Sequence, residues 1–101
     1  MSADNYVPVN NTTVTLSVTQ ANTQGTLTPV GRANKLLVQN FGASTAYFRV
    51  GAGAQTAVVT DTPIPAYKSF CFAMEDTFTG IAAICDTGLT ATLKASQMYG
   101  V

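Results

Sequence analysis

The sequence contains no histidine and no tryptophan among its 101 residues, and only 10% of them are charged. Histidine is the usual proton carrier of enzymes near neutral pH and a common zinc ligand, so its absence removes the most frequent acid–base and metal chemistry. Glu75 and Asp76 are neighbours in sequence, so their side chains diverge instead of facing each other as a glycosidase requires. We therefore predict that the protein is not an enzyme and has no catalytic residue, metal or other cofactor.

Charge of either sign is scarce and balanced. Five Lys and Arg residues offset five Asp and Glu residues, and the positive residues are spread along the chain. Binding to a phosphate backbone needs clustered basic residues, so we predict no nucleic-acid partner. No apolar run approaches the roughly 20 residues that span a bilayer, and the start MSADNYVPVN lacks the features of a secretion signal. We therefore expect no membrane partner and synthesis in a cytoplasm.

The low charge content occurs together with a hydrophobic fraction of 47%. Soluble domains typically carry about 25% charged residues, which keep separate copies dispersed. Apolar surface without charge usually marks contact with other molecules. The composition therefore predicts that copies or partners cover much of the surface.

Cysteine is limited to Cys71 and Cys85. Three states are open for them. In the first, both cysteines are small apolar side chains of the core; in the second, they form a disulfide after release from the cell; in the third, they belong to a metal site completed by other residues. The first state suits a cytoplasmic product best, because thiols stay reduced there.

Short alternations of apolar and polar residues fill most of the chain. The clearest is TTVTLSVTQ at 12–20, in which Val14, Leu16 and Val18 alternate with hydroxyl residues. Further strands are predicted at residues 35–40, 46–51, 56–60, 69–74, 79–85 and 89–95, with a short one around Leu27. The strands at 35–40 and 46–51 are expected to form a hairpin across FGAST. This spacing predicts an all-β, single-domain antiparallel β-sandwich of about seven or eight strands, a class that includes jelly-roll-like folds.

The stretch TDTPIPAYKSFCFAME at 60–75 combines two prolines with an alternating strand. Pro63 and Pro65 lack backbone donors, so this segment is expected to run extended along a sheet edge. Phe70 and Phe72 are predicted to point inward, with Cys71 on the opposite face. The full predicted core is Leu16, Val18, Leu36, Val38, Phe48, Val50, Val58, Phe70, Phe72, Ile81, Ile84 and Leu93, in which Ile81 and Ile84 have opposite parity.

The order of motifs resembles that of a known group of proteins. LLVQNFGASTAYFRVG is followed by TPIPA, an aromatic strand, TGIAAIC and TGLTATLKAS. Over roughly residues 35–96 this order is similar to the small β-sandwich virion proteins of tailed bacteriophages, which include capsid decoration or cement proteins. Where these proteins usually have Gly after PIPA, this chain has Tyr67. Either the turn is built differently here or the tyrosine has another use.

The resemblance implies a structural virion protein, made in the host cytoplasm, that stabilises the phage head by bridging capsomers. Its partner would be the major capsid protein or another virion protein, and it would form a homo-oligomer, with a trimer favoured. The alternatives are a component of the phage tail, neck or fibre, and a β-sandwich module that binds a host surface or carbohydrate. The absence of Trp weakens the carbohydrate alternative, because sugar rings are commonly held on exposed aromatic side chains.

Partner contacts are expected at the chain ends and at Tyr67. We predict an extended N-terminal arm at 1–11, the sandwich at 12–95 and a C-terminal tail at 96–101, with both ends ordered mainly by neighbouring molecules. Tyr67 follows a proline-stiffened loop and combines an apolar ring with a polar tip, as interface anchors do. The predicted partner-binding residues are Tyr6, Val7, Val9, Tyr67, Met98, Tyr99 and Val101.

Overall fold

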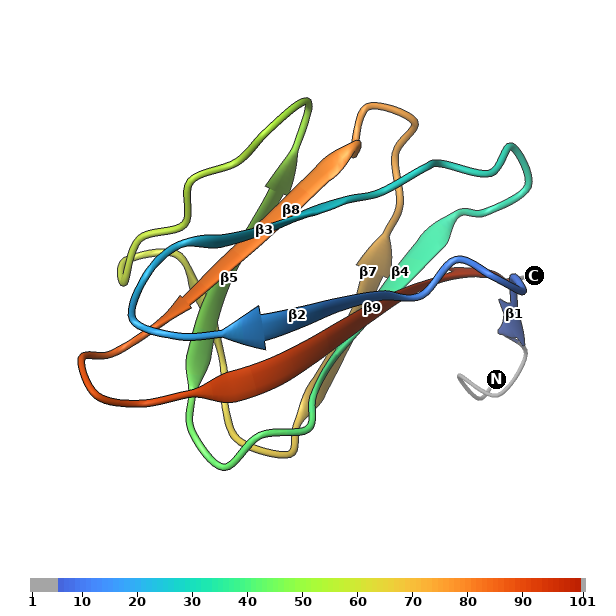
Figure 1. Ribbon diagram of the computed structural model, residues 1–101. Helices are drawn as coiled ribbons and strands as arrows, with labels where there is room; N and C mark the ends of the chain where they lie inside the picture. The colour runs from blue at the N-terminus through green and yellow to red at the C-terminus, as the bar shows by residue number, and fades with distance from the viewer. Residues whose placement is uncertain (1–5, 101) are drawn as a thin grey trace.

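The computed structural model describes residues 6–100, and all regular secondary structure in this range is β-strand (Figure 1). The strands are β1 (Val7–Pro8), β2 (Val14–Val18), β3 (Thr23–Thr26), β4 (Lys35–Asn40), β5 (Ala46–Gly51), β6 (Thr62–Ile64), β7 (Ser69–Ala73), β8 (Gly80–Cys85) and β9 (Ala91–Tyr99). The predicted all-β class is confirmed. Residues 6–100 contain no helix that is long and apolar enough to cross a membrane.

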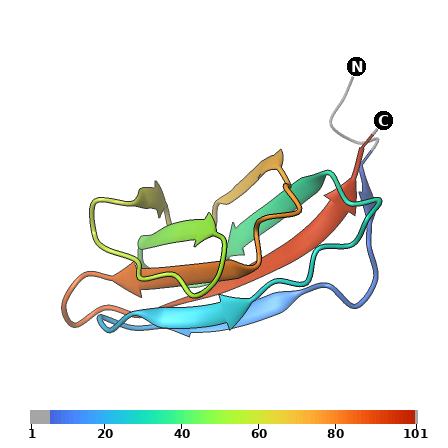
Figure 2. The same cartoon turned by 90° about the horizontal axis from the view of Figure 1, so that it is seen from above.

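The strands form two antiparallel sheets. In the first, β1 and β2 both pair with one side of the long β9, followed by β4 and β7; in the second, the order is β3-β8-β5-β6. β1 lies beside the C-terminal end of β9 (Figures 1 and 2). The pairs β2–β9, β3–β8, β4–β7 and β5–β6 are nested, so the chain from β2 to β9 is one long hairpin rolled onto itself. This nesting is the topology of a jelly roll.

The core lies between the sheets and is built from one face of each strand. Leu16 and Val18 of β2, and Leu36 and Val38 of β4, are buried while their sequence neighbours are more exposed. Such alternation follows from the period of two along a strand. Seven of the predicted core residues are buried, namely Leu16, Val18, Leu36, Val38, Phe48, Ile81 and Leu93, and Val50 and Phe72 pack against them partly buried.

Three predicted core residues are placed differently. Val58 is 43% exposed because its segment is a turn, and Phe70 is 40% exposed because β7 is the outermost strand of its sheet. Ile84 is only partly buried and lies on the outer face of β8, as its parity relative to the buried Ile81 requires. Cys85 is a core side chain as predicted, whereas Cys71 is exposed, and neither forms a disulfide.

Strand positions were predicted better than strand pairing. The bounds 35–40 and 46–51 match β4 and β5, but the predicted hairpin is wrong because the two strands belong to different sheets. Residues 56–60 form no strand. The predicted boundary of the sandwich at 95 lies inside β9, which continues to Tyr99.

The proline segment does lie at an edge. β6, which contains Pro63, is the last strand of the second sheet, and among the described residues it pairs with β5 alone. Its edge position tolerates a residue that has no N–H to donate. The expectation of an extended edge segment is therefore confirmed for Thr62–Ile64.

Asp61 explains why residues 56–60 turn instead of pairing. Its Oδ2 accepts a hydrogen bond from Val58 N–H (2.8 Å), and its Oδ1 accepts from Arg49 Nη2 (3.0 Å) and Nε (3.2 Å). The Val58 N–H bond, followed by the Arg49 guanidinium, lowers the pKa of Asp61 below its ordinary value. The Asp61 carboxylate therefore links the turn that contains Val58 to Arg49 of β5.

This pKa shift predicts an acid-sensitive turn. A carboxyl whose pKa is lowered in the folded state stabilises that state above its unfolded pKa of about 3.9, and the contribution is lost as pH falls through the lower folded value. Asp61→Asn is therefore expected to destabilise the protein at neutral pH, with a difference from the wild type that shrinks below about pH 3.9. Urea unfolding of both proteins at several pH values measures this, and a difference independent of pH would contradict it.

Candidate functional site

Tyr67 occupies an unusual backbone position. Lys68 N–H donates to the Pro65 carbonyl (3.1 Å), which closes a four-residue turn between β6 and β7. Tyr67, the third residue of this turn, has φ of +60° and is 71% exposed. A positive φ at the third position is the mark of a type II turn and strongly favours glycine. The turn keeps the glycine-type geometry, so the side chain is what differs from the resembled pattern.

The tyrosine contributes little to folding at this position. A left-handed conformation costs an L-residue roughly 1–2 kcal/mol relative to the right-handed one, and glycine avoids that cost. The exposed ring offers little burial in return. Backbone strain of this kind is commonly retained at binding sites, where the side chain is needed for contact with another molecule.

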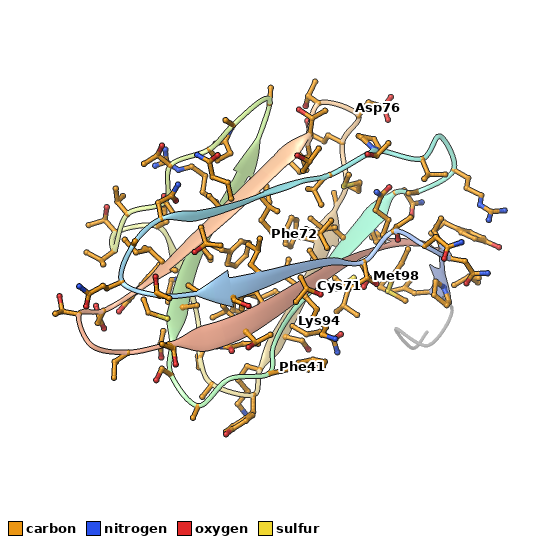
Figure 3. The ribbon with its side chains drawn as sticks, viewed as in Figure 1. Phe41, Cys71, Phe72, Asp76, Lys94 and Met98 are labelled. Atoms are coloured by element: carbon orange, nitrogen blue, oxygen red, sulfur yellow. The ribbon has the colours of Figure 1, made fainter. Side chains whose placement is uncertain are left out.

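The neighbouring turn presents a second exposed aromatic ring. Phe41 follows β4 directly and is 52% exposed, and its N–H is held by the Thr92 carbonyl (2.8 Å). The Lys94 ammonium lies 5.6 Å from the centre of the Phe41 ring, a favourable cation–π distance (Figure 3). A shallow hollow of about 330 Å³ is lined by Gln39, Asn40, Phe41, Tyr67, Lys68 and Ser69. We call the hollow and these residues the aromatic tip.

Buried Asn40 holds the two turns of the aromatic tip together. Its Nδ2 donates to the carbonyls of Ser44 (2.9 Å) and Ile64 (3.0 Å), and its Oδ1 accepts from Gly42 N–H (2.8 Å). Asn40 is 1% exposed. The side chain therefore links the β4–β5 turn to the end of β6, just before the turn that carries Tyr67.

The predicted terminal contact residues gather at a different place. Val7 and Pro8 pair with Tyr99 and Met98, so β9 of the same chain contacts this part of the arm. Val7 and Pro8 therefore need no neighbour for their pairing, and the expectation that neighbouring molecules order both ends stays a prediction. Val9 is corrected, because it is 7% exposed and its N–H bonds the carbonyl of Gln97 (2.9 Å).

The remaining terminal residues form a mixed aromatic and basic group. The Lys35 ammonium lies 5.8 Å from the Tyr6 ring centre, and the Arg32 guanidinium lies 5.3 Å from that of Tyr99. Val7 is 39% exposed and Met98 is partly buried. Val101, also predicted to bind a partner, lies outside the described residues. The structure thus brings Tyr6, Val7, Met98 and Tyr99 together but does not place Tyr67 with them.

Sequence reasoning missed Phe41 and Lys94. Phe41 sits in NFG, a turn signal, where a lone aromatic residue has no alternating neighbours that would bury it. That mismatch is a usable signal of exposure. Lys94 gave no such signal, because its place beside Phe41 follows from the pairing of β4 with β9.

The aromatic tip is suited to binding and offers no obvious chemistry. Its polar groups are one ammonium, two hydroxyls and two amides, without a carboxylate or thiol among the residues around the hollow. Elsewhere among residues 6–100, no group of three or more His, Cys, Asp or Glu side chains is placed to hold a metal ion.

Comparison with known proteins gives a likeness of fold. No family model matches the chain, and no curated protein matches it. The crystal structure of PirA is similar, with a TM-score of 0.55 and 9% sequence identity, over 88% of this chain and 95% of PirA. At this identity the likeness supports the sandwich architecture alone.

Proposed function

We propose that this protein is a structural component of a bacteriophage particle, a capsid decoration protein that binds other virion proteins through the aromatic tip. The observation that carries the proposal is Tyr67, a 71% exposed ring kept at a backbone position that favours glycine. Contact with another molecule explains why a residue is kept that lowers folding stability and buries little of its own surface.

Fold and composition support the same proposal. Jelly rolls are frequent in viral capsid proteins, although the fold alone does not determine function. A chain in which only 10% of the residues are charged favours assembly, and repetition over a particle strengthens weak contacts through avidity. The resemblance to phage virion proteins covers β4 to β9, which includes both turns of the tip.

Copy number in purified phage particles tests the proposed place in the particle. Quantitative mass spectrometry of particles from the phage that encodes the protein is expected to find on the order of hundreds of copies, as repeated binding over a shell requires. A few dozen copies or fewer would place the protein in the tail or neck, and complete absence from washed particles would contradict a structural role.

A second candidate function is carbohydrate binding at the same tip. Two exposed aromatic rings flank a hollow that also contains Gln39, Ser69 and Lys68, a combination of stacking faces and hydrogen-bonding groups. A glycan array probed with the wild type, Phe41→Ala and Tyr67→Ala tests it. Binding that is lost in both variants would favour this function over the capsid role.

A further inference from the structure

Among residues 6–100, no strand pairs with the outer edge of β7. On its other side it pairs with β4, and the bonds Asn40 N–H to Lys68 O (2.9 Å) and Met74 N–H to Asn34 O (3.0 Å) fix which residues face β4. Hydrogen-bonded pairs alternate along an antiparallel ladder. The backbone N–H and C=O groups of residues 68, 70, 72 and 74 therefore point toward β4. The N–H and C=O groups of Ser69, Cys71 and Ala73 therefore point outward at the edge of the sheet.

This edge has none of the usual protection against strand pairing. Proline, lysine and bulges block stray pairing in many proteins, and Pro63 serves this purpose on β6, the edge strand of the other sheet. β7 reads Ser-Phe-Cys-Phe-Ala, with neither proline nor charge. The side chains of Ser69, Cys71 and Ala73 lie on the outer face of the sheet and are small, so they leave room for another strand beside β7.

An apolar cleft opens beside this edge on the inner face. The rings of Phe70 and Phe72 lie with their centres 6.5 Å and 6.0 Å from that of Phe48 on β5. The cleft has a volume of about 580 Å³ between β7 and the strands β5 and β6, and Phe70 remains 40% exposed at its mouth. An unpaired edge next to an apolar cleft provides both parts of a strand-addition site: backbone groups for pairing and space for alternate side chains.

We propose that β7 of a second copy of this chain occupies this site, antiparallel to the first and related to it by a two-fold axis at Cys71. The sequence of β7 is nearly symmetric about Cys71, with Phe on both sides and small residues beyond. In this register Phe70 lies beside Phe72 of the second copy, and Ser69 opposes Ala73. Four phenylalanine rings then cover the joined clefts, and the outward backbone groups of both copies pair.

The charges beyond the two ends of β7 fit the same arrangement. Lys68 precedes the strand, and Glu75 and Asp76 follow it within two to three residues; all three are exposed. An antiparallel partner brings the lysine end of each copy toward the acidic end of the other. Complementary charges of this kind favour the correct register and orientation.

The proposed dimer differs from the trimer favoured by resemblance. A self-complementary edge contact is isologous and closes after two copies. The dimer is independent of partner binding at the aromatic tip and of the phage assignment, because self-association is measured in the absence of particles. The dimer would join two sheets into one continuous sheet and present two aromatic tips.

Cysteine cross-linking of the full chain tests the register. Opposed residues in a hydrogen-bonded pair have Cα atoms about 5.5 Å apart, within the range of a disulfide. Partial desolvation raises the pKa of the Cys71 thiol, although the residue is exposed, and nearby Lys35 offsets part of this rise, so oxidation is run at about pH 9. Copper phenanthroline, which accepts the two electrons, is expected to yield a dimer linked through Cys71. The link should be lost in Cys71→Ser and retained in Cys85→Ser.

A mixed cross-link provides the sharper control. In a Cys71→Ser background, Ser69→Cys and Ala73→Cys chains are expected to link to each other when mixed and to link at least tenfold less when each is alone. Equal linking of all combinations would indicate random collision and overturn the register.

Sedimentation gives an independent readout that needs no oxidant. Cys71→Lys is expected to weaken dimerisation at least tenfold, because it places a charge at the centre of the edge. Leu89→Lys, at an exposed residue outside β7, is the matched control and should dimerise as the wild type does. A wild-type chain that stays monomeric at several hundred micromolar would overturn the proposal.

Discussion

Phe48→Ala is expected to lower the free energy of unfolding by about 3–5 kcal/mol, the range for removing a buried phenylalanine ring. Phe48 is 6% exposed and stands between the sheets, with the rings of Phe70 and Phe72 on the opposite sheet nearby. Its removal would leave a cavity next to the open cleft and separate the two sheets at this side.

Phe70→Ala is the matched control for Phe48→Ala. The two rings are in contact range of each other, but Phe70 is 40% exposed, so truncation should cost the isolated monomer about 1–2 kcal/mol. Urea unfolding at low micromolar concentration compares the two variants without contribution from self-association. Equal losses would contradict the assignment of Phe48 to the core and Phe70 to its margin.

Asn40→Leu is expected to cost about 3–4 kcal/mol, although leucine is similar in size to asparagine. The substitution leaves two carbonyls and one N–H without their hydrogen-bond partner, and each buried unsatisfied group costs about 1–3 kcal/mol. Part of this cost is relieved where water reaches the turn. Because Asn40 links both turns of the aromatic tip, binding to phage particles should weaken together with folding stability.

Asn34→Leu serves as the control, because Asn34 directly precedes β4 at the end opposite to Asn40. Asn34 also makes two side-chain hydrogen bonds, to the N–H (2.8 Å) and carbonyl (3.2 Å) of Gly100, but it is exposed. Water replaces these bonds, so a loss of about 1 kcal/mol or less is expected. Chemical unfolding measures both variants, and an equal loss would show that burial of Asn40 is not the deciding factor.

The fold class followed from the sequence because strand period and turn residues are local signals. Val14, Leu16 and Val18 alternate with hydroxyl residues, and the structure buries the last two on one face. Pairing was harder, because the FGAST turn ends one strand and starts another without indicating whether the chain stays in the same sheet. In a jelly roll most partners are distant in sequence, as β2 and β9 are.

Two local errors have identifiable causes. TAVVT has the composition of a strand, but Asp61 captures the Val58 N–H and turns the segment. Phe70 has the parity of a core residue, but β7 is an edge strand, and an edge position depends on strand order and not on local sequence.

The candidate site was only partly predictable. Tyr67 was singled out because it replaces a glycine of the resembled pattern, and its φ of +60° gives the physical reason for that preference. Phe41 joins it only through the fold, by way of the Asn40 hydrogen bonds between two turns. The terminal residues Val7 and Val9 were expected to need a partner, yet β9 supplies the contacts within the chain.

We propose that Tyr67 is kept for binding at the expense of folding, and one variant measured in two ways tests this role most directly. Tyr67→Gly relieves the left-handed strain, so the free energy of unfolding should rise by about 0.5–1 kcal/mol after the entropy cost of glycine is included. Binding to phage particles should weaken by about tenfold or more, which corresponds to about 1.4 kcal/mol. Tyr67→Phe, which keeps the ring, should lose much less affinity. A Tyr67→Gly protein that is less stable and binds particles as tightly as the wild type would contradict the account.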